Sequence, residues 1–510
     1  MSERPAFLRK LAYLALVALL ILPLSWLGMP ATSGTENRPG SAGGRLARLR
    51  TQNRLSQANL GEIDPSSVAI KLVTLGLHNV AGLFLWTKSN NYAMKQDWTR
   101  LSATLEQQIK LQPHYIGPWI YQGWNLSYNV SAEFDDYRDR YHWVMRGIDF
   151  LEDGTRYNEN EPRLRWEIGW FTGYKIGRAD EHKQFRRLFR QDDEFHRDRP
   201  PALRDNWLVG KESYLKAQDM VANEGVTVKG TSPLIFYSGP PMWQINYATA
   251  IESEGVFGEA ARVAWDTAAR EWAEYGRREF PTFEGETFRL TDLEALLAKQ
   301  ADLVKKIEAI DPGLRARLAE ERRAALSDVQ RAALEKPSTS RTKDEANAAR
   351  EAARSLLVTD RDLVERMPDS RRDEAKSLLD ELVKNSELVR RVEQSRLPVN
   401  YEYWDMRCRA ERTENALESR RIAYEGDQAF LEGLDMETAR VAYEKALSLW
   451  RKVLDEFPRL LEDSVTGEEI VDVIHRYQES LKRLDQPLPE DYFGLNEVIK
   501  LHEGTRIKSD

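Results

Sequence analysis

The sequence predicts an all-α protein in which an N-terminal transmembrane helix precedes an α-solenoid of helix pairs with inserted long charged helices. Three features support this fold class: a helical stripe that occurs twice, a tryptophan-rich body broken by Pro and Gly at helical intervals, and a tryptophan-free middle rich in Ala, Leu, Arg and Glu. With 510 residues, 41% of them apolar, the chain can build more than one core.

The repeated stripe lies in two segments that are far apart in the chain. Much of Glu254–Pro281 returns as Glu432–Pro458, and between Ala261–Trp272 and Ala439–Trp450 six of twelve positions are identical. In both, three alanines and a tryptophan follow steps of three, four and four residues, which places them on one helix face. We expect both segments to be second helices of separate repeat units. The long charged stretch between them leaves open whether they stack directly.

The N-terminus carries an uncharged stretch, Leu11–Met29, whose 19 residues span about 28 Å as a helix, close to one hydrocarbon core. Basic residues, including Arg9 and Lys10, precede it, as in a signal anchor or a secretory signal. Poor cleavage positions favour an uncleaved anchor over residues 1–30. Residues 31–65 then form a flexible linker to an exported body. Arginines on the far flank weaken the argument for this orientation, and a buried globular helix is the remaining alternative.

The aromatic-rich domain, residues 66–282, contains segments of helical length. We expect helices at Ser66–Met94, Trp98–Leu111, from Pro118, at Ala132–Leu151, from Pro162, at Asp180–His196, Met242–Glu254 and Gly258–Glu279. Between them Gly225–Trp243, with the pair Pro240-Pro241, predicts a long loop that packs against the body rather than binding a ligand.

The spacing of Pro113, Trp119 and Gly123 resembles that of tetratricopeptide repeats, which are helix-turn-helix units of about 34 residues. The match is degenerate, because Gln122 and Leu126 replace the usual Leu and Tyr. The resemblance implies a solenoid of TPR-like pairs.

Leu75–Trp124 also resembles the first repeat of certain bacterial membrane-anchored repeat proteins, in which a leucine-rich helix precedes an L-x-P-H/R-aromatic segment. Leu111, Pro113, His114 and Tyr115 match that segment. This resemblance implies a scaffold and no particular reaction.

Residues 283–400 form a charged, coiled-coil-like helical region. Prolines interrupt its apolar seams, so we expect long antiparallel helices that project from the solenoid, with Lys336–Lys343 at the tip, rather than one continuous coiled coil. The charged surface is either plain solvated helix or an arm that grips a partner or a second copy.

Residues 401–510 predict a C-terminal TPR-like unit and cap. We expect a first helix at Asn400–Glu432, a second at Asp435–Phe457 and a capping helix at Glu468–Leu484, followed by an irregular tail from Pro487.

The sequence holds no recognisable catalytic motif, and we expect no catalytic, cofactor-binding or metal-binding residues. The weak candidates are the pairs Asp193/His196 and Asp472/His475 for a metal, Asp192-Asp193-Glu194 and Asp135-Asp136 for acid–base work, and Trp119, Tyr121, Trp124, Trp166 and Trp170 for a sugar or peptide groove. At helical spacing we expect these aromatic residues to be core. The single cysteine, Cys408, excludes an internal disulfide and is expected to be buried.

Two hypotheses for function follow. The first is a membrane-anchored helical-repeat scaffold that binds unidentified protein partners in a bacterial cell-envelope assembly, with the body on the extracytoplasmic side of the inner membrane. The alternative is an envelope enzyme on an α/α scaffold, for example one that acts on glycans, with acidic residues in an aromatic cleft. The net charge of −8 gives no reason to expect nucleic acid, and the oligomeric state is open.

Overall fold

The computed structural model describes residues 41–52 and 78–503, except 224, 227, 229, 283 and 284, together with six single positions between 15 and 27. This part of the chain is almost wholly helical, which confirms the all-α fold class. The anchor predicted at Leu11–Met29 falls almost entirely outside the described residues. Among the helices that are described, none has the length and apolarity needed to cross a membrane.

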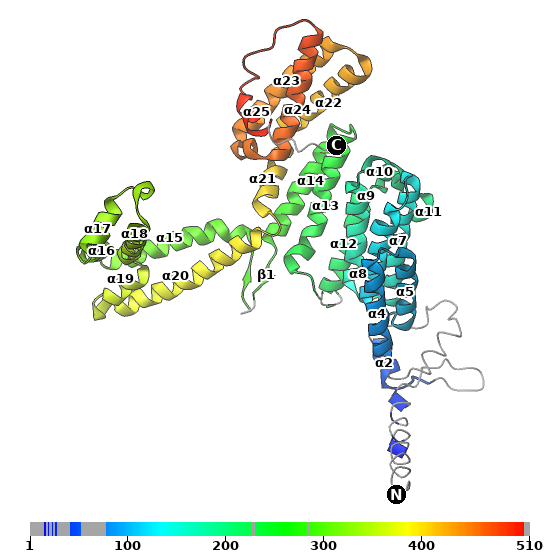
Figure 1. Ribbon diagram of the computed structural model, residues 1–510, viewed down its shortest axis with the longest axis horizontal. Coiled ribbons are helices and arrows are strands. Elements are labelled where there is room, and N and C mark those ends of the chain that lie inside the picture. The colour runs from blue at the N-terminus through cyan, green and yellow to red at the C-terminus, as the bar shows by residue number, and fades with distance from the viewer. Residues whose placement is uncertain are drawn as a thin grey trace.

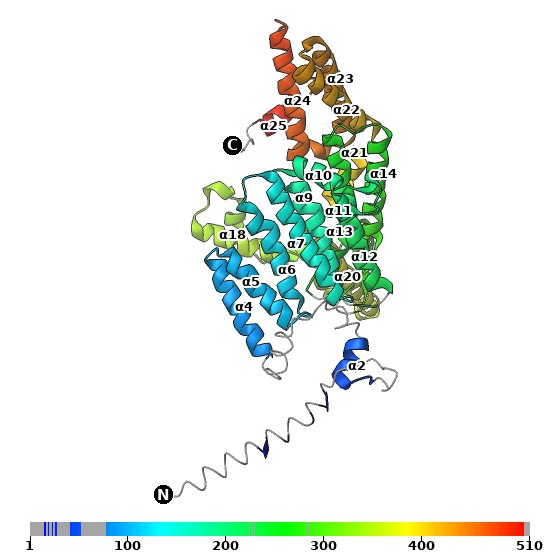
Figure 2. The same cartoon turned by 90° about the vertical axis from the view of Figure 1, so that its right-hand side faces the viewer.

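The aromatic body is a row of helices that pack on their neighbours in chain order (Figure 2). After the short α2 (Arg45–Gln52), the row consists of α4 (His78–Met94), α5 (Trp98–Leu111), α6 (Ile116–Trp124), α7 (Tyr137–Tyr157), α8 (Pro162–Trp170), α9 (Ile176–Arg178), α10 (His182–Gln191), α11 (Asp193–His196), α12 (Asn206–Asn223), α13 (Pro233–Ser253) and α14 (Glu259–Arg277). Pro162 occupies the first turn of α8 as predicted, since its missing N–H costs nothing there.

The loop predicted at Gly225–Trp243 is wrong over its second half, because α13 already begins at Pro233 and carries Pro240 and Pro241 inside it. A proline removes the N–H that the carbonyl four residues earlier would accept. The structure compensates at Phe236, whose carbonyl accepts a hydrogen bond from the Gln218 side chain of α12 at 3.3 Å. A neighbouring helix therefore compensates for the N–H that Pro240 lacks.

The two copies of the repeated stripe are α14 and α23 (Met436–Glu456), and both bury it. They do not pack mainly on each other. Helix α14 packs on α13 and on α21 (Tyr401–Glu411), whereas α23 packs on α22 (Glu414–Gln428) and on α24 (Ser464–Arg483). The two copies are thus buried in separate cores, with α21 and α22 between them in the chain.

A long helical arm leaves the body between α14 and α21, as Figure 1 shows in green and yellow. Its shaft is α15 (Leu293–Ile310) packed on α20 (Asp369–Arg396), and its far end holds α16 (Leu314–Ala324), α17 (Asp328–Glu335), α18 (Lys343–Leu356) and α19 (Asp360–Arg366). This confirms long helices that project from the body. At the base, β1 (Phe280–Pro281) pairs antiparallel with β2 (Thr287–Phe288), a feature the sequence analysis missed.

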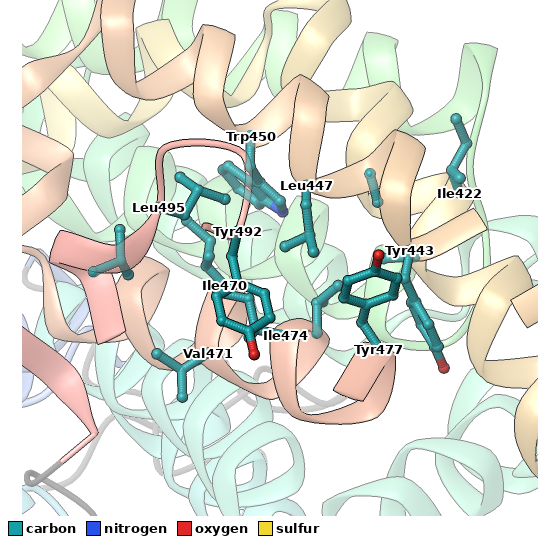
Figure 3. Close-up of a cluster of buried hydrophobic side chains, with 14 of the residues drawn as sticks. Ile422, Tyr443, Leu447, Trp450, Ile470, Val471, Ile474, Tyr477, Tyr492 and Leu495 are labelled. Carbon is teal, nitrogen blue, oxygen red and sulfur yellow. The ribbon is translucent and has the colours of Figure 1, made fainter. Parts of the chain in front are cut away.

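The C-terminal unit has its own core, part of which Figure 3 shows, with Trp450 and Tyr443 of α23 facing Ile470, Ile474 and Tyr477 of α24. The first helix predicted at Asn400–Glu432 is broken, because Thr413 caps α22 by accepting the Ala416 N–H at 3.3 Å. The predicted irregular tail also contains a helix, α25 (Asn496–His502). It forms because Leu495 and Val498 bury against this core.

Candidate functional site: an aromatic stripe

A continuous series of ring contacts runs across three helices of the aromatic body. We call this series the aromatic stripe; its members are Trp86 of α4, Tyr121 and Trp124 of α6, Tyr128, Trp170 of α8 and Tyr174. Successive ring centroids lie 5.7 Å (Trp86–Tyr121), 6.0 Å (Tyr121–Trp124), 6.0 Å (Trp124–Tyr128), 6.0 Å (Tyr128–Trp170) and 5.1 Å (Trp170–Tyr174) apart. The stripe therefore links α4, α6 and α8 through contacts between aromatic side chains.

The aromatic stripe is only partly covered by the protein. Trp124 is 38% exposed and Tyr174 is 44% exposed, while Tyr121, Tyr128 and Trp170 are half-buried. By contrast, Trp207 and Tyr214 of the same body are each only 1% exposed. Half-exposed clusters of Trp and Tyr are typical of binding surfaces, where the rings supply a large apolar contact and a polar edge.

Two π-helical turns carry members of the stripe: η1 (Asn125–Val130), which continues α6, and η2 (Phe171–Lys175), which continues α8. A π turn frees carbonyl groups from their usual partners. In η2 the side-chain amide of Asn206 donates to the carbonyls of Thr172 and Gly173, at 3.3 and 2.9 Å. Tyr128 lies in η1 and Tyr174 in η2, so a side chain of α12 stabilises the widened backbone that carries Tyr174.

A glycine notch fixes the helix behind the stripe. A Cβ added to Gly173 would lie 2.1 Å from Nε1 of Trp243, and one added to Gly169 would lie 2.7 Å from the carbonyl of Gly210. Nε1 of Trp243 donates to the Gly169 carbonyl at 2.8 Å. Because glycine has no side chain at these positions, α12 and α13 can approach closely enough to hold Trp170 and Tyr174 in place, and no larger residue would fit.

An aromatic pocket of 460 Å³ opens between α6 and α8 on this face. Its lining is largely apolar and includes Tyr121, Trp124 and Trp170. Two charged side chains also line it, and they pair with each other, since Arg163 Nε lies 3.6 Å from Glu167 Oε1. The pocket is of a size that accepts one large side chain or a small ligand.

A basic pocket of 310 Å³ adjoins it, with Tyr128 and Tyr174 in its lining. Lys175 Nζ lies 4.2 Å from the centroid of the Tyr128 ring, and Arg178 donates from Nη2 to Asn246 Oδ1 at 2.6 Å. Arg140, the third cation, forms an ion pair with Glu181. Within the described part of the chain, Lys175 and Arg178 make no ion pair with a carboxylate.

Burial shifts the pKa of several groups in these pockets, raising that of Tyr121 and lowering that of Arg178. It raises the pKa of Glu167 against the opposing effect of Arg163, and it lowers the pKa of Lys175 because the ammonium is partly removed from water. Burial, and then Tyr174, raise the pKa of Tyr128. Tyr128 is consequently a neutral hydrogen-bonding group near neutral pH.

A larger hollow of 700 Å³ lies between α12 and the start of α13 and makes a weaker candidate. Its only ring, Tyr237, is covered by the guanidinium of Arg278, whose Cζ lies 3.8 Å from the ring centroid. It has no counterpart to the linked rings of the aromatic stripe.

The five aromatic residues that the sequence singled out do not share one environment. Trp119 is buried at 4% exposure, its Nε1 donating to the Pro113 carbonyl at 2.9 Å, and Trp166 packs on Tyr214 with ring centroids 5.4 Å apart. Tyr121, Trp124 and Trp170 instead line the aromatic pocket. The expectation that all five belong to the core is therefore wrong for Trp124, which is 38% exposed, while Trp170 both packs against the core and lines the pocket.

The other candidates from the sequence serve structural roles. His196 is buried and its Nε2 lies 2.7 Å from the Phe189 carbonyl, while Asp193 pairs with Arg204 at 2.5 Å. Asp192 accepts a hydrogen bond from the Tyr141 hydroxyl at 2.9 Å, and Asp136 caps α7. Among the described residues no group of three His, Cys, Asp or Glu is arranged to hold a metal ion.

Sequence reasoning missed Trp86, Tyr128, Tyr174, Lys175 and Arg178 as site residues. One signal was present, because Tyr121, Trp124 and Tyr128 follow steps of three and four residues on the exposed side of a helix whose core side is marked by Trp119. The spacing of residues does not predict the contact between Tyr128 and Trp170, since that contact depends on how the helices α6 and α8 pack.

No family model matches the chain, and no curated protein is significantly similar to it.

Proposed function

We propose that this protein is a membrane-anchored helical-repeat scaffold that binds a partner protein through the aromatic stripe, in a bacterial cell-envelope assembly. The half-exposed stripe across three helix pairs carries the proposal, because Trp and Tyr are enriched where proteins bind one another and contribute most of the binding energy. The uncharged segment Leu11–Met29 supports the anchor, and the helix pairs support repeats of the TPR-like kind.

Purification of the intact chain from detergent-solubilised membranes, followed by identification of the co-purifying proteins, tests this function. A double variant, Trp124→Ala/Tyr174→Ala, removes the two most exposed rings of the stripe, and we expect it to lose the partner. Trp143→Ala is the matched control, because Trp143 is also half-buried and stacked on a ring, Phe134, but lies outside the stripe. Equal recovery of every partner by both variants and the wild type would reject the stripe as the binding surface.

The alternative, a glycan-acting envelope enzyme, has one observation in its favour. Glu167 lines the aromatic pocket and its raised pKa suits a general acid. Glycoside hydrolysis ordinarily needs two carboxylates, and Glu167 is the only one among the described residues that line this pocket. If Glu167→Gln abolishes release of reducing ends from peptidoglycan fragments while partner capture persists, the enzyme hypothesis replaces the scaffold.

A further inference from the structure

We infer that the aromatic stripe recognises an extended, acidic peptide segment of its partner, which places a large apolar or aromatic side chain in the aromatic pocket and a carboxylate in the basic pocket. This inference rests on the proposed scaffold function and specifies the chemistry of the partner. It follows from the charge of one pocket, the apolar lining of the other and the short path between them.

Two cations of the basic pocket form no ion pair with a carboxylate in the described structure. Lys175 contacts the face of Tyr128, and Arg178 donates to the neutral amide of Asn246. Glu181 pairs with Arg140, and Asp180 is exposed to solvent. Both carboxylates attract Lys175 without forming an ion pair with it, so the lining keeps three cations against two carboxylates. An incoming carboxylate would gain charge-assisted hydrogen bonds from Lys175 and Arg178, which are roughly twice as strong as neutral ones.

The aromatic pocket favours an apolar side chain over a sugar. A sugar ring presents hydroxyl groups that need several polar partners. The charged groups in this lining, Arg163 and Glu167, already pair with each other, and most of the remaining surface is carbon from rings and isoleucines. A Phe, Trp or Leu side chain would bury its apolar surface here and would itself need no hydrogen-bond partner from the lining.

The two pockets are close enough for one short segment to fill both. Trp124 lines the aromatic pocket and Tyr128 lines the basic pocket, and their ring centroids are 6.0 Å apart. Tyr121 lies another 6.0 Å beyond Trp124. Lys175 Nζ lies 4.2 Å from the Tyr128 centroid, so the path from this ammonium is about 10 Å to Trp124 and about 16 Å to Tyr121. Because an extended chain rises about 3.3 Å per residue, the apolar and acidic residues of the ligand are expected about three to five positions apart.

Selection from a random ten-residue peptide display library on the full chain in detergent micelles tests this inference. We expect enriched peptides to carry Asp or Glu three to five positions from a large apolar residue. A fluorescein-labelled consensus peptide should bind at least about tenfold more tightly than its Asn or Gln counterpart in fluorescence anisotropy. That ratio corresponds to about 1.4 kcal/mol.

Charge reversal provides the sharper comparison. Lys175→Glu/Arg178→Glu should lose the acidic peptides and select basic ones, whereas Lys175→Gln/Arg178→Gln should lose about tenfold in affinity without gaining basic peptides. Lys305→Glu/Lys376→Glu, on the exposed surface of the arm, is the matched control and should select the same acidic peptides as the wild type. Far-ultraviolet circular dichroism and the melting temperature establish that each variant is folded.

The outcomes separate this inference from the function on which it rests. Peptides enriched by the wild type over Trp124→Ala/Tyr174→Ala but without acidic residues, or indifferent to charge reversal, would overturn the inference and leave the scaffold standing. If no peptide is enriched over that variant, protein binding at the stripe fails as well. If a heparin oligosaccharide binds the wild type and no peptide is enriched, the basic pocket is reassigned to an anionic glycan.

Discussion

Buried indole rings hold the helix pairs of this protein together, and each is stabilised by different neighbours. Trp272 of α14 is fully buried, lies parallel to Tyr401 with ring centroids 5.9 Å apart, and donates from Nε1 to the Tyr401 carbonyl at 3.2 Å. Trp450 of α23 is equally buried under the guanidinium of Arg420, at 4.8 Å. Its Nε1 has no hydrogen-bond partner among the described residues. The repeated sequence motif thus places one residue type in two chemical environments.

These environments predict different responses to substitution. Trp272→Ala and Trp450→Ala should each lower the free energy of unfolding by about 3–5 kcal/mol, because each empties a buried site. Trp272→Phe should cost more than Trp450→Phe, since the former removes a hydrogen bond whereas the latter removes a buried N–H that has no partner in the described structure. Urea unfolding followed by circular dichroism measures both, and a loss within error for either alanine variant would contradict the assigned stripe.

A second prediction at the residue scale concerns Glu252, which is buried at 6% exposure near Arg407 and Arg420 and has one carboxylate oxygen without a hydrogen-bond partner in the described structure. Burial raises its pKa above 4.5, against the opposing effect of Arg420. A raised folded-state pKa penalises folding once the carboxyl ionises, so wild-type stability should fall as pH rises from 4.5 through that pKa.

Glu252→Gln removes the charge and should raise the melting temperature at pH 7 by about 2 °C. At pH 4, where the wild-type carboxyl is largely protonated in both states, the difference should shrink. Differential scanning calorimetry at the two pH values measures this effect. A variant less stable at pH 7 than at pH 4, relative to the wild type, would show that the arginines over-compensate the burial.

At the scale of elements, the arm has two regions with separate cores. Leu303, Ile307 and Leu382 belong to the core at the far end of the arm, whereas Leu293 and Val389 belong to the core shared with α14 and α21. Asn385 joins the shaft helices where these regions meet, donating to the Leu296 carbonyl at 2.8 Å. The far end therefore contributes nothing to the core that holds the body.

This separation predicts local unfolding. Ile307→Ala, at a position with 0% exposure, should destabilise the far end of the arm by about 2–5 kcal/mol. Amide hydrogen exchange should accelerate between residues 298 and 384, while α14 and α21 keep their protection. Leu297→Ala is the matched control, because Leu297 lies on the same helix and is 44% exposed. Faster exchange in α14 would mean that the arm and the body unfold together.

At the scale of the whole molecule, the body, the arm and the C-terminal unit radiate from α21 (Figure 1). The core of the C-terminal unit draws only on residues from Met406 to Ile499. The core around Trp272 instead combines residues from Leu234 to Leu296 with residues from Val389 to Leu417, so it closes only when the chain returns from the arm.

The self-contained C-terminal core predicts that a fragment of residues 401–503 folds alone. We expect a helical circular dichroism spectrum and one cooperative thermal transition, which Trp450→Ala should abolish or lower strongly. The complementary fragment, residues 41–282, lacks Tyr401 and should not protect α14. A 401–503 fragment without cooperative unfolding would show that its core needs the body.

Much of the architecture was predictable because local signals agreed with it. Asp97, Asp136 and Pro162 mark helix starts where the sequence analysis placed new helices or first turns, and the change in composition after Pro281 marks the arm. The start of α13 was not predictable. Its proline pair predicts a helix break from local sequence. The hydrogen bond that Gln218 of another helix donates to the Phe236 carbonyl is a tertiary contact, which local sequence does not reveal. The half-exposed site was missed for a similar reason, since helical spacing identifies a face but not its neighbour.

The sequence by itself determined the all-helical class, most helix positions, the projecting arm and the burial of the repeated Ala–Trp stripe, because helix periodicity, caps and composition act within a few residues. Only the tertiary structure decided that α21 lies between α14 and the C-terminal unit, and that Trp124, Tyr128 and Trp170 meet as one stripe. Both depend on which helix faces pack together. The packing of helix faces is determined by contacts between residues distant in the chain, which local sequence patterns do not predict.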